Sequence, residues 1–586
     1  MKKKNPKQKH KITSSAGASK MEKNQKVVKH ERHHPRTEKK PDTELFWADQ
    51  LADEVIKLAK KHNCAANCAG GASPSGTKHI GNLFDAMKPW VVYKAIKRRN
   101  FPAHFIHYYN DLDPLRTIPT KIADMDANWV DTKKFEAELL KYLGWPYISV
   151  PDPLECHASW AEHFEKVWED GMFAAGIAEK DTELVHISKL YKEGKFDPCI
   201  MQILENIEKA RAIIKKFQKT VPEDYIPFHA ICENCGKITT RATGFDIVNK
   251  TISYVCEGRT LAGKYTIEGC GHRGVAGFHD GKLPWRFEWP AQWAIMKVMF
   301  EAFGKEHAEG SWPSGRVIVK EIYKTDPPVP HVYELILING EKMATRRGNV
   351  FIAQEILDVI EPEIFTYFYT KRSLKQRNLD LKNIYHLVDE FEKVERIYFG
   401  LEDEPNKKEK ATVKRMYETS MPDMPGKPPI RIPYQFAAVV AQTTISEEHG
   451  LNVLQTTGHA PNKPTEEEKE TILERLNLAR NWVEKFAPEK RITIHEHVPD
   501  AIKKKLTDAQ KQALRDVAMF IRDKPTMTEE ELHNKFYEII KYHKMKSNEF
   551  FTAAYLALIG KPSGPKLAQF IVAVGEPKVR RILEQI

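Results

Sequence analysis

The stretch "GASPSGTKHIGN", residues 71–82, decides the fold. It consists mostly of small residues and turn formers, and a helix with a clear apolar side is predicted directly after it, over residues 81–98. "AHFIHYYNDLDPLR", residues 103–116, then predicts a strand that ends in an acidic loop. A strand, a glycine-containing loop, a helix and a second strand form the opening unit of a nucleotide-binding α/β fold.

The chemistry of this loop points to phosphate. A turn of small residues lets a nucleotide approach the backbone closely, and the N-terminus of the next helix offers free N–H groups and a positive dipole end. We expect His79 to donate to phosphate oxygens and Gly81 to leave room for an adenine or ribose. A plain structural turn is the alternative for an isolated His-Ile-Gly-Asn, but the preceding Pro-Ser-Gly and the βαβ context favour a nucleotide site.

The rest of the chain changes character several times. Residues 42–62 predict a helix with Asp42 as its N-cap, and residues 130–220 are mostly of helical pattern. "GRVIVKEIY" (315–323) and "HVYELILING" (331–340) predict strands and loops. Beyond about residue 350 the pattern is almost wholly helical, with capping boxes at Thr465–Glu468 and Thr528–Glu531.

Charge is concentrated at the N-terminus. The 586 residues carry a net charge of +11, and residues 1–40 alone hold 14 Lys and Arg against 3 Asp and Glu. The remaining residues are therefore formally neutral. Such a basic segment, poor in large apolar residues, predicts disorder over residues 1–42 and salt-sensitive affinity for a polyanion such as RNA. A solvated tail without function is the alternative.

No segment predicts export or a membrane span. No apolar run approaches the 18 or so residues that a membrane helix needs, and the basic N-terminus has no apolar region of the kind found in secretory signals. We expect a cytoplasmic protein.

The eight cysteines do not form a disulfide pattern, because the chain is large and has no secretory signal. Cys232 and Cys235 form a CxxC knuckle, and Cys270 follows at zinc-ligand spacing with His272, or alternatively Cys256, as the fourth ligand. We expect a structural zinc in an insertion over residues 221–280, with a redox pair as the alternative. Cys64 and Cys68 are predicted as buried small residues.

A second phosphate-related stretch, "KMATRRGNV" at residues 342–350, is ambiguous. Its flanks, Lys-Met and Gly-Asn, resemble a catalytic loop. Its middle does not spell the expected motif, so the end of a β-hairpin is the alternative.

Together these stretches resemble class I aminoacyl-tRNA synthetases. "HIGN" is similar to their HIGH-type signature and "KMATRRGNV" lies where their KMSKS-type loop falls. Within that class the chain, from about residue 45 onward, resembles the archaeal-type class I lysyl-tRNA synthetases. The resemblance rests on these stretches: "GASPSGTKHIGN", "NDLDPLR", "PDPLECHASWAEHF", "ICENCGK", "GCGHRG", "WRFEWPAQW", "FGKEH", "KMATRRGNV" and "GKPSGPKLAQFI".

The resemblance implies an α/β, Rossmann-like catalytic domain over residues 43–335, with the zinc-binding insertion inside it. A loop-bearing helical connection over 336–405 and an α-helical, anticodon-binding bundle over 406–586 would follow. The implied substrates are ATP with Mg²⁺, L-lysine and tRNA(Lys). We expect a monomer, with association into a multi-synthetase complex as a further option.

The resemblance also implies site residues. His79, Gly81 and Asn82 would hold ATP, while Lys342 and Arg347, or Arg346, would neutralise its phosphates. The expected lysine-binding residues are the following: Gly71, Ser73, Asp111, Asp113, Trp285, His307 and Tyr333. For the two aspartates loop capping is the alternative. For Trp285 it is core packing, and for His307 it is a structural histidine.

Two departures from the family pattern leave the amino-acid specificity open. Gln292 stands where an arginine is usual and Glu306 where an aspartate is usual. A synthetase for another amino acid, or an inactive RNA-binding paralogue, are the alternative functions. For anticodon contacts, Tyr434, Arg480, Trp482 and Lys566 are candidates, and each could equally be core or surface.

Overall fold

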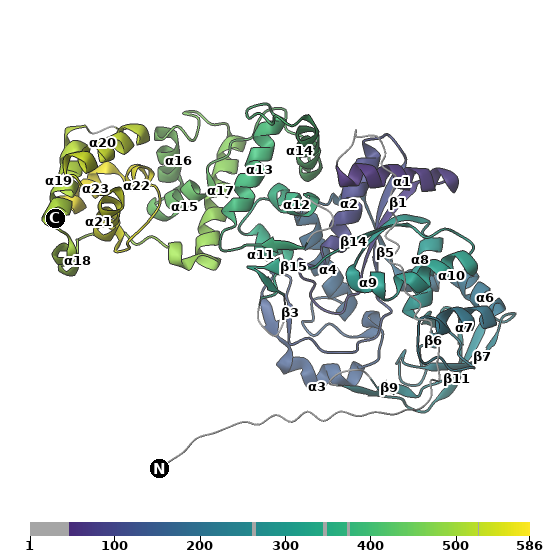
Figure 1. The fold of residues 1–586 in the computed structure, drawn as a ribbon. Coiled ribbons are helices and arrows are strands. Elements are labelled where there is room, and N and C mark those ends of the chain that lie inside the picture. The colour runs from purple at the N-terminus through teal and green to yellow at the C-terminus, as the bar shows by residue number, and fades with distance from the viewer. Residues whose placement is uncertain (1–45, 261–264, 344–348, 372–375, 525–526) are drawn as a thin grey trace, which may run out of the picture. The chain divides into compact units, whose positions relative to one another are not determined.

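Five parallel strands form the central sheet, in the order β14–β13–β1–β2–β5 (Figure 1). The computed structural model of the chain describes residues 46–260, 265–343, 349–371, 376–524 and 527–586. The strands are these: β1 Ala66–Ala72, β2 Ala103–Tyr109, β5 Thr182–His186, β13 Val298–Gly304 and β14 Val329–Tyr333. The chain builds the sheet outward from β1 to β5 and then returns to the other side of β1 with β13. The strand order therefore reverses between β1 and β13, which is where α/β sheets bind ligands.

Two helices cover one face of the sheet next to this reversal. α1 (Trp47–Lys61) buries Ala48, Ala52, Val55 and Ala59, a stripe at helical spacing. α2 (Phe84–Lys97) packs against β1, β2 and β13 and is buried almost all round. Its first turn lies so close to β1 that a Cβ on Gly70 would come within 1.9 Å of the Asp85 carbonyl oxygen. Small residues at the end of β1 are thus needed to bring α2 against the strand.

The prediction of a strand over residues 315–323 is wrong, because this segment lies in the helix α10 (Trp312–Glu321). The buried positions Gly315, Ile318, Val319 and Ile322 repeat at three and four residues, the period of a helix. The β-branched composition hid that period. The adjacent prediction over 331–340 is confirmed, since β14 and then β15 (Ile336–Ile338) occupy it.

The segment between β2 and β13 holds helices and a largely antiparallel insertion. The sequence pattern, which is mostly helical over residues 130–220, did not predict the strand β5 within this segment. The helices are these: α3 Glu136–Leu139, α4 Trp160–Ala174, α5 Ile187–Lys192, α6 Asp197–Glu205, α7 Ile207–Lys215, α8 Trp285–Ile295 and, after β13, α9 Lys305–Glu309. The short strands are these: β3 Lys121–Ala123, β4 Trp129–Asp131, β6 His229–Ala230, β7 Arg241–Asp246, β8 Thr251–Val255, β9 Gly258–Thr260, β10 Thr266–Glu268, β11 Arg273–Gly277 and β12 Gly281–Lys282.

"KMATRRGNV" begins inside a β-hairpin. β15 pairs with β16 (Glu341–Lys342), and β17 (Arg377–Leu379) pairs with the other edge of β15. Asn339 and Gly340 form the turn, with φ of 50° and 83°. An Asn-Gly pair with positive φ at both positions is the sequence that a two-residue hairpin turn favours.

The C-terminal part is helical, as predicted (green to yellow in Figure 1). Thr465 and Thr528 form the two expected capping boxes. The helices are these: α11 Ala353–Leu357, α12 Pro362–Thr370, α13 Tyr385–Tyr398, α14 Lys407–Ser420, α15 Tyr434–Thr443, α16 Glu447–Thr456, α17 Glu466–Lys485, α18 Asp500–Lys505, α19 Asp508–Asp523, α20 Glu529–Tyr542, α21 Ser547–Ile559, α22 Leu567–Val574 and α23 Glu576–Leu583.

Some predictions fall outside the described residues. They are the tail over residues 1–42 with the Asp42 cap, and the segment that holds Arg346 and Arg347. In the part of the chain that is described, no helix has the length and apolar character needed to cross a membrane.

Candidate active site and metal clusters

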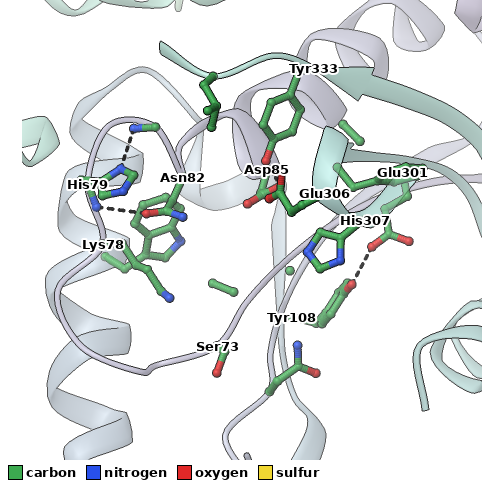
Figure 2. A pocket seen from close by; sticks show the side chains of 18 of the residues that line it. Ser73, Lys78, His79, Asn82, Asp85, Tyr108, Glu301, Glu306, His307 and Tyr333 are labelled. Carbon is green, nitrogen blue, oxygen red and sulfur yellow. Dashed lines mark hydrogen bonds between the residues drawn. The ribbon is translucent and has the colours of Figure 1, made fainter. Parts of the chain in front are cut away.

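A cavity of about 560 Å³ opens at the carboxyl ends of β1, β2, β13 and β14, next to the point where the strand order reverses (Figure 2). Its walls include these predicted site residues: Gly71, Ser73, His79, Gly81, Asn82, Asp113, Trp285, His307, Tyr333 and Lys342. Residues from both signature stretches thus line one cavity, although more than 250 positions separate them in the chain.

The loop between β1 and α2 holds His79 in one protonation state. The ring Nδ1 of His79 accepts from the Gly81 backbone N–H at 3.0 Å, and the backbone N–H of His79 donates to Asn82 Oδ1 at 3.2 Å. Burial, with the nearby Lys78 cation, lowers the pKa of His79 to about 4. The imidazole is therefore neutral at pH 7. Since Nδ1 accepts a hydrogen bond, Nε2 carries the proton and can donate it to a ligand oxygen.

Two glycines in the cavity wall have no room for a side chain. A Cβ on Gly71 would lie 2.2 Å from the Tyr108 ring, and one on Gly81 would lie 2.8 Å from the Met343 methyl group. Met343 directly follows Lys342, and the Ile80 N–H donates to the Phe351 carbonyl at 2.9 Å. The first stretch is therefore bound through its backbone to the residue that directly follows the second stretch, and Met343 of the second stretch lies against Gly81.

Two acidic residues that the sequence did not reveal lie in the cavity wall. Asp85, in the first turn of α2, accepts a hydrogen bond from the Tyr333 hydroxyl, and burial raises the pKa of Asp85 to about 7. Glu301, on β13, accepts from the Tyr108 hydroxyl at 2.5 Å, and burial raises its pKa to about 7 as well. Raised carboxyl pKa values of this kind are common at functional sites.

Glu301 is the more fully engaged of the two. Trp289 Nε1 donates to both of its oxygens at 3.1 Å, and Trp293 Nε1 donates to one. The second oxygen of Asp85 has no partner among the described residues. Asp85 is therefore the carboxylate that can accept a ligand, while Glu301 orients the aromatic wall.

The aromatic wall gathers around Ser311. The Ser311 hydroxyl lies 3.2 Å from both Trp285 Nε1 and His307 Nδ1, and the Trp285 ring stacks on Trp289 at 5.2 Å. Burial lowers the pKa of His307, although the Glu306 carboxylate opposes this effect. The site thus offers flat apolar surfaces next to the carboxylate of Asp85.

The two aspartates of "NDLDPLR" have different roles. Asp113 lines the cavity, but Lys282 pairs with it at 2.5 Å; burial opposes the charge on Asp113, and the Lys282 ammonium outweighs it and lowers the pKa. Asp111 is a correction. It is fully buried away from the cavity and accepts from the backbone and hydroxyl of Ser188 in the first turn of α5. Asp111 therefore caps the first turn of α5, a structural role that differs from both the lysine-binding role and the loop capping considered from the sequence.

The two departures from the family pattern also differ in position. Glu306 lines the cavity. Gln292 is fully buried outside it, and its amide donates to the Asn110 side chain at 2.8 Å, which itself lines the cavity. Only Glu306 can therefore touch a ligand directly, whereas Gln292 acts through Asn110.

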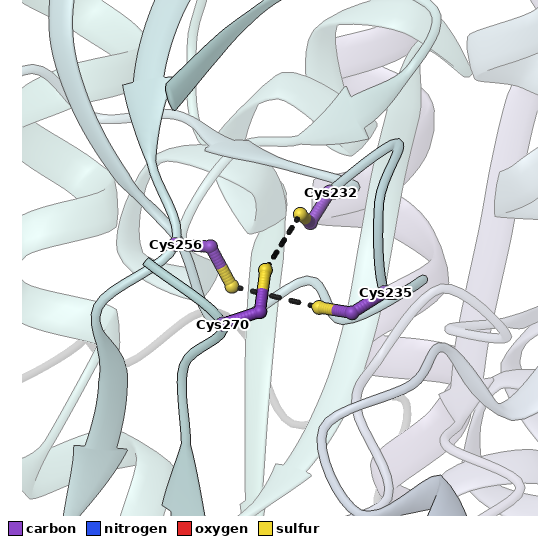
Figure 3. Close-up of side chains that lie close together, drawn as sticks. All are labelled: Cys232, Cys235, Cys256 and Cys270. Atoms are coloured by element: carbon purple, nitrogen blue, oxygen red, sulfur yellow. Dashed lines mark hydrogen bonds between the residues drawn. The ribbon is translucent and has the colours of Figure 1, made fainter. Parts of the chain in front are cut away.

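Four thiols form a compact cluster in the insertion (Figure 3). The Sγ atoms of Cys232 and Cys270 are 3.7 Å apart, and those of Cys235 and Cys256 are 3.6 Å apart. Zinc–sulfur bonds of about 2.3 Å in a tetrahedron place the sulfur atoms about 3.8 Å apart, so the four thiols fit a zinc ion. His272 is a correction, because its Nε2 instead lies 2.8 Å from the Glu233 carboxylate. The fourth candidate zinc ligand is therefore the thiol of Cys256, the alternative given from the sequence.

A second cluster with the chemistry of a metal site was missed. It lies in "PDPLECHASWAEHF", where the Cys156 thiol is 3.2 Å from Asp152 Oδ2, 3.1 Å from His157 Nδ1 and 3.2 Å from His163 Nδ1. His163 and Asp152 are buried, and His163 Nε2 lies 2.9 Å from the Ala123 carbonyl. That contact fixes the ring so that Nδ1 faces the cluster. The adjacent Cys-His pair was the sequence signal.

Two further cavities lie outside the central one. One, of about 810 Å³, shares Asp113, Arg116 and Trp285 with the central cavity and extends along the insertion past Arg241. Another, of about 620 Å³, lies among α15, α17 and the segment 559–569.

The candidates for anticodon contact fall into two groups. Tyr434 and Trp482 are fully buried at the base of the C-terminal cavity, with their polar atoms bound to the backbone carbonyls of Val359 and Leu381. They are core residues, the alternative given above. Lys566 lines the same cavity, and Arg480 does not.

Comparison with known proteins places this arrangement in a family. A family model described as "tRNA synthetases class I (K)" matches residues 45–423, and one described as "Anticodon binding domain" matches residues 463–586.

Individual relatives extend along most of the chain. A lysine–tRNA ligase of Natronomonas pharaonis is 37% identical over 540 residues, which cover 92% of this chain and 96% of the relative. One of Pyrococcus horikoshii is 32% identical over 549 residues, covering 90% and 97%. A solved glutamate tRNA ligase of Elizabethkingia meningosepticum covers 89% of this chain and 98% of its own at 12% identity, but its TM-score of 0.40 carries no argument. From the family match and the shared length, the chain belongs to the class I (K) tRNA synthetases.

Proposed function

We propose that this chain is a lysine–tRNA ligase whose central cavity carries out both steps of the reaction. In the first step a carboxylate oxygen of lysine attacks the α-phosphorus of ATP. The bond to the bridging oxygen breaks, pyrophosphate leaves and lysyl-adenylate forms. In the second step a hydroxyl of the terminal ribose of tRNA attacks the lysyl carbonyl, and AMP leaves. The protein supplies positioning and charge, and no protein nucleophile is needed.

In this proposal ATP is held from two sides, by the loop between β1 and α2 that contains "HIGN" (the HIGN loop) and by the segment that begins at β16 with Lys342. His79, neutral and with Nε2 protonated, donates to phosphate oxygens. Lys342 reaches the same cavity from β16 and supplies positive charge as the phosphates separate. Arg347, with Arg346 next in order, is proposed to add charge from the adjoining segment. Mg²⁺ would accompany the ATP phosphates, the role this ion has in phosphoryl transfer.

The lysine side chain is proposed to lie between Asp85 and the aromatic wall of Trp285 and His307. An ammonium group needs acceptors, and a methylene stem packs well against flat apolar rings. Asp85 has a carboxylate oxygen without a partner among the described residues, and Glu306 adds a second negative charge at the cavity mouth. Gly71, Ser73 and Tyr333 shape the remaining wall.

Contacts with tRNA are proposed at two places. The cavity along the insertion adjoins the central cavity through Arg116 and Trp285, so a single-stranded 3′ end that enters there would bring its terminal ribose to the adenylate. The C-terminal cavity, beside Lys566, is proposed to accept an anticodon base. The basic N-terminal segment is proposed to add non-specific affinity for RNA.

Zinc is proposed in the four-thiol cluster, and a second metal ion of the same kind in the Asp152–Cys156–His157–His163 cluster. Both clusters consist of the ligand types that zinc binds in proteins, and most of these ligands lie in loops. Metal analysis of the purified chain should find two ions per chain. Cys256→Ser and Cys156→Ser should each lose one, and His272→Gln should lose none. Loss of zinc from His272→Gln would return that histidine to the ligand set.

One observation carries the main proposal: the Asp85 carboxylate, which has one oxygen without a partner among the described residues, and an aromatic wall share one cavity with both signature stretches. The test is exchange of labelled pyrophosphate into ATP in the presence of each amino acid, followed by charging of total tRNA. Lysine should support exchange and tRNA(Lys) should be charged. Exchange with another amino acid would support the alternative synthetase, and no exchange would support the inactive RNA-binding paralogue.

The phosphate assignments need a separate test. Lys342→Ala and Arg347→Ala should each slow pyrophosphate exchange. If Arg347→Ala leaves the rate unchanged, Arg346 becomes the candidate. A cytoplasmic location, a monomeric state and association with other synthetases stay predictions.

A further inference from the structure

Lys78 is a cation of the central cavity that the proposed reaction has not used. It directly precedes His79 in the loop between β1 and α2, and it lines the same cavity as His79, Asn82 and Lys342. Figure 2 shows its side chain reaching from the loop toward the cavity, on the side of His79.

Among the described residues, no carboxylate forms an ion pair with Lys78. Its one hydrogen bond in the described part of the chain is to the Ser75 hydroxyl at 3.1 Å, within the same loop. Neither nearby carboxylate of the described residues forms an ion pair with Lys78, since Asp85 accepts from Tyr333 with one oxygen and Asp113 pairs with Lys282. Burial lowers the pKa of Lys78 to about 8, although Asp85 and Asp113 both favour the charged form. An anion bound in the cavity would relieve that cost.

The neighbouring histidine cannot supply this charge. His79 is neutral at pH 7, because burial and Lys78 itself lower its pKa to about 4. On the loop between β1 and α2, hydrogen-bond donation therefore comes from His79 and positive charge comes from Lys78. Lys342 supplies charge only from the opposite hairpin.

We propose that Lys78 is a phosphate-binding residue of the ATP site and the fixed positive charge on the HIGN side of the cavity. The inference rests on the proposed function, because it takes ATP as the ligand of this loop. The competing role, which the test separates, is that the Lys78 ammonium, near Asp85, occupies the place of the substrate ammonium and hinders lysine binding. The two roles predict opposite effects of removing the charge.

The test measures binding to the full chain by calorimetry, so that it does not depend on catalysis. ATP, adenosine and L-lysine are titrated into the wild type, Lys78→Met and Lys78→Arg. Lys57→Met, which removes an exposed charge on α1, is the matched control. Lys78→Met should weaken ATP binding about 10- to 100-fold, the effect of a lost hydrogen bond to a charged group. Adenosine and lysine should bind within about twofold of the wild type, Lys78→Arg should retain most of the ATP affinity, and Lys57→Met should change nothing.

Three results would overturn the assignment. Unchanged ATP affinity in Lys78→Met would show that Lys78 does not touch phosphate. Equal weakening of ATP and adenosine would show a general disturbance of the loop, and Lys78→Arg would then be weakened too. Tighter lysine binding without loss of ATP affinity would show the blocking role instead. Lysine-dependent pyrophosphate exchange by the wild type tests the proposed function separately, so the two failures can be told apart.

Discussion

Buried charges in the central cavity and buried charges in the helical region are arranged in opposite ways. In the cavity, neither Asp85 nor Lys78 forms an ion pair with a described residue, and burial raises the pKa of Asp85 and lowers that of Lys78. In the helical region, Arg475 pairs with Glu361 at 2.5 Å and with Glu392 at 2.9 Å. Burial disfavours the Arg475 charge as well, but the two carboxylates outweigh it and raise the pKa.

A second buried arginine in the helical region is paired with carboxylates in the same way. Arg431 pairs with Glu363 at 2.8 Å and with Glu395 at 3.1 Å, and Tyr417 donates to Glu395 at 2.9 Å. These networks join α12, α13 and α17. Ion pairs of this kind fix the packing of the helices. A buried charge without an ion-pair partner at the carboxyl ends of the strands is instead available to bind a ligand. Burial of a charge therefore indicates function only where its partner is missing.

The largest effect is expected in the paired network. Arg475→Met should lower the free energy of unfolding by about 3–5 kcal/mol, because Glu361 and Glu392 would stay buried without a partner. Urea unfolding measures this loss, and Arg480→Met on the same helix should change stability little. Lysine-dependent exchange at 25 °C should stay near the wild-type rate for the folded fraction. A stability loss no larger than that of Arg480→Met would remove the distinction between the two regions.

In the cavity, removing a buried charge should lower activity and leave stability unchanged. Asp85→Asn should lower kcat/KM for lysine about 10- to 150-fold, since the ammonium loses its charged acceptor. The melting temperature should not fall, because the substitution also removes the cost of burying a carboxylate. Lys57→Met again serves as a control. A melting temperature lowered as much as in Arg475→Met, with normal kcat/KM, would make Asp85 a structural residue.

The pH dependence should separate these roles further. Burial raises the pKa of Asp85 to about 7, and only the ionised form binds an ammonium group. Lysine affinity should therefore fall about tenfold per pH unit below about pH 7, and Asp85→Asn should abolish this dependence. The pH dependence of the folding stability has the opposite sign to that of lysine affinity. A carboxyl group with a raised folded-state pKa favours the folded state at low pH, and this contribution is lost as the pH rises from about 4 to 7.

The smallest effect is expected at Glu306, an exposed residue of the cavity wall. Glu306→Asp introduces the aspartate expected from the family resemblance and shortens an exposed side chain by one methylene. Exposed charges contribute at most about 1 kcal/mol, so KM for lysine should change less than about fivefold. Discrimination against arginine and ornithine in the exchange assay would show whether Glu306 tunes specificity. A change above tenfold would mean that Glu306, and not Asp85, is the main ammonium acceptor.

The sequence revealed more of the motifs than of the pocket between them. The β1–α2 unit, the capping boxes and the CxxC knuckle were recognisable, because each depends on residues close together in the chain. The strand predicted over residues 315–323 was wrong, since the buried face of α10 becomes visible only when its neighbours are known. Asp85 and Glu301 were missed, because single carboxylates in apolar stretches carry no local pattern.

The amino-acid sequence by itself determined the family, the nucleotide loop and three of the four thiols, since short-range spacing encodes backbone turns and ligand sets. Only the tertiary structure decided that Cys256 replaces His272, that Asp111 caps a helix and that Asp85 is left with an unpaired oxygen. These outcomes depend on which distant segments meet: the four thiols within the insertion, the loop after β2 against α5, and α2 against β14. The charge state of a buried group follows from its neighbours in space, and the sequence order of those neighbours carries little information about them.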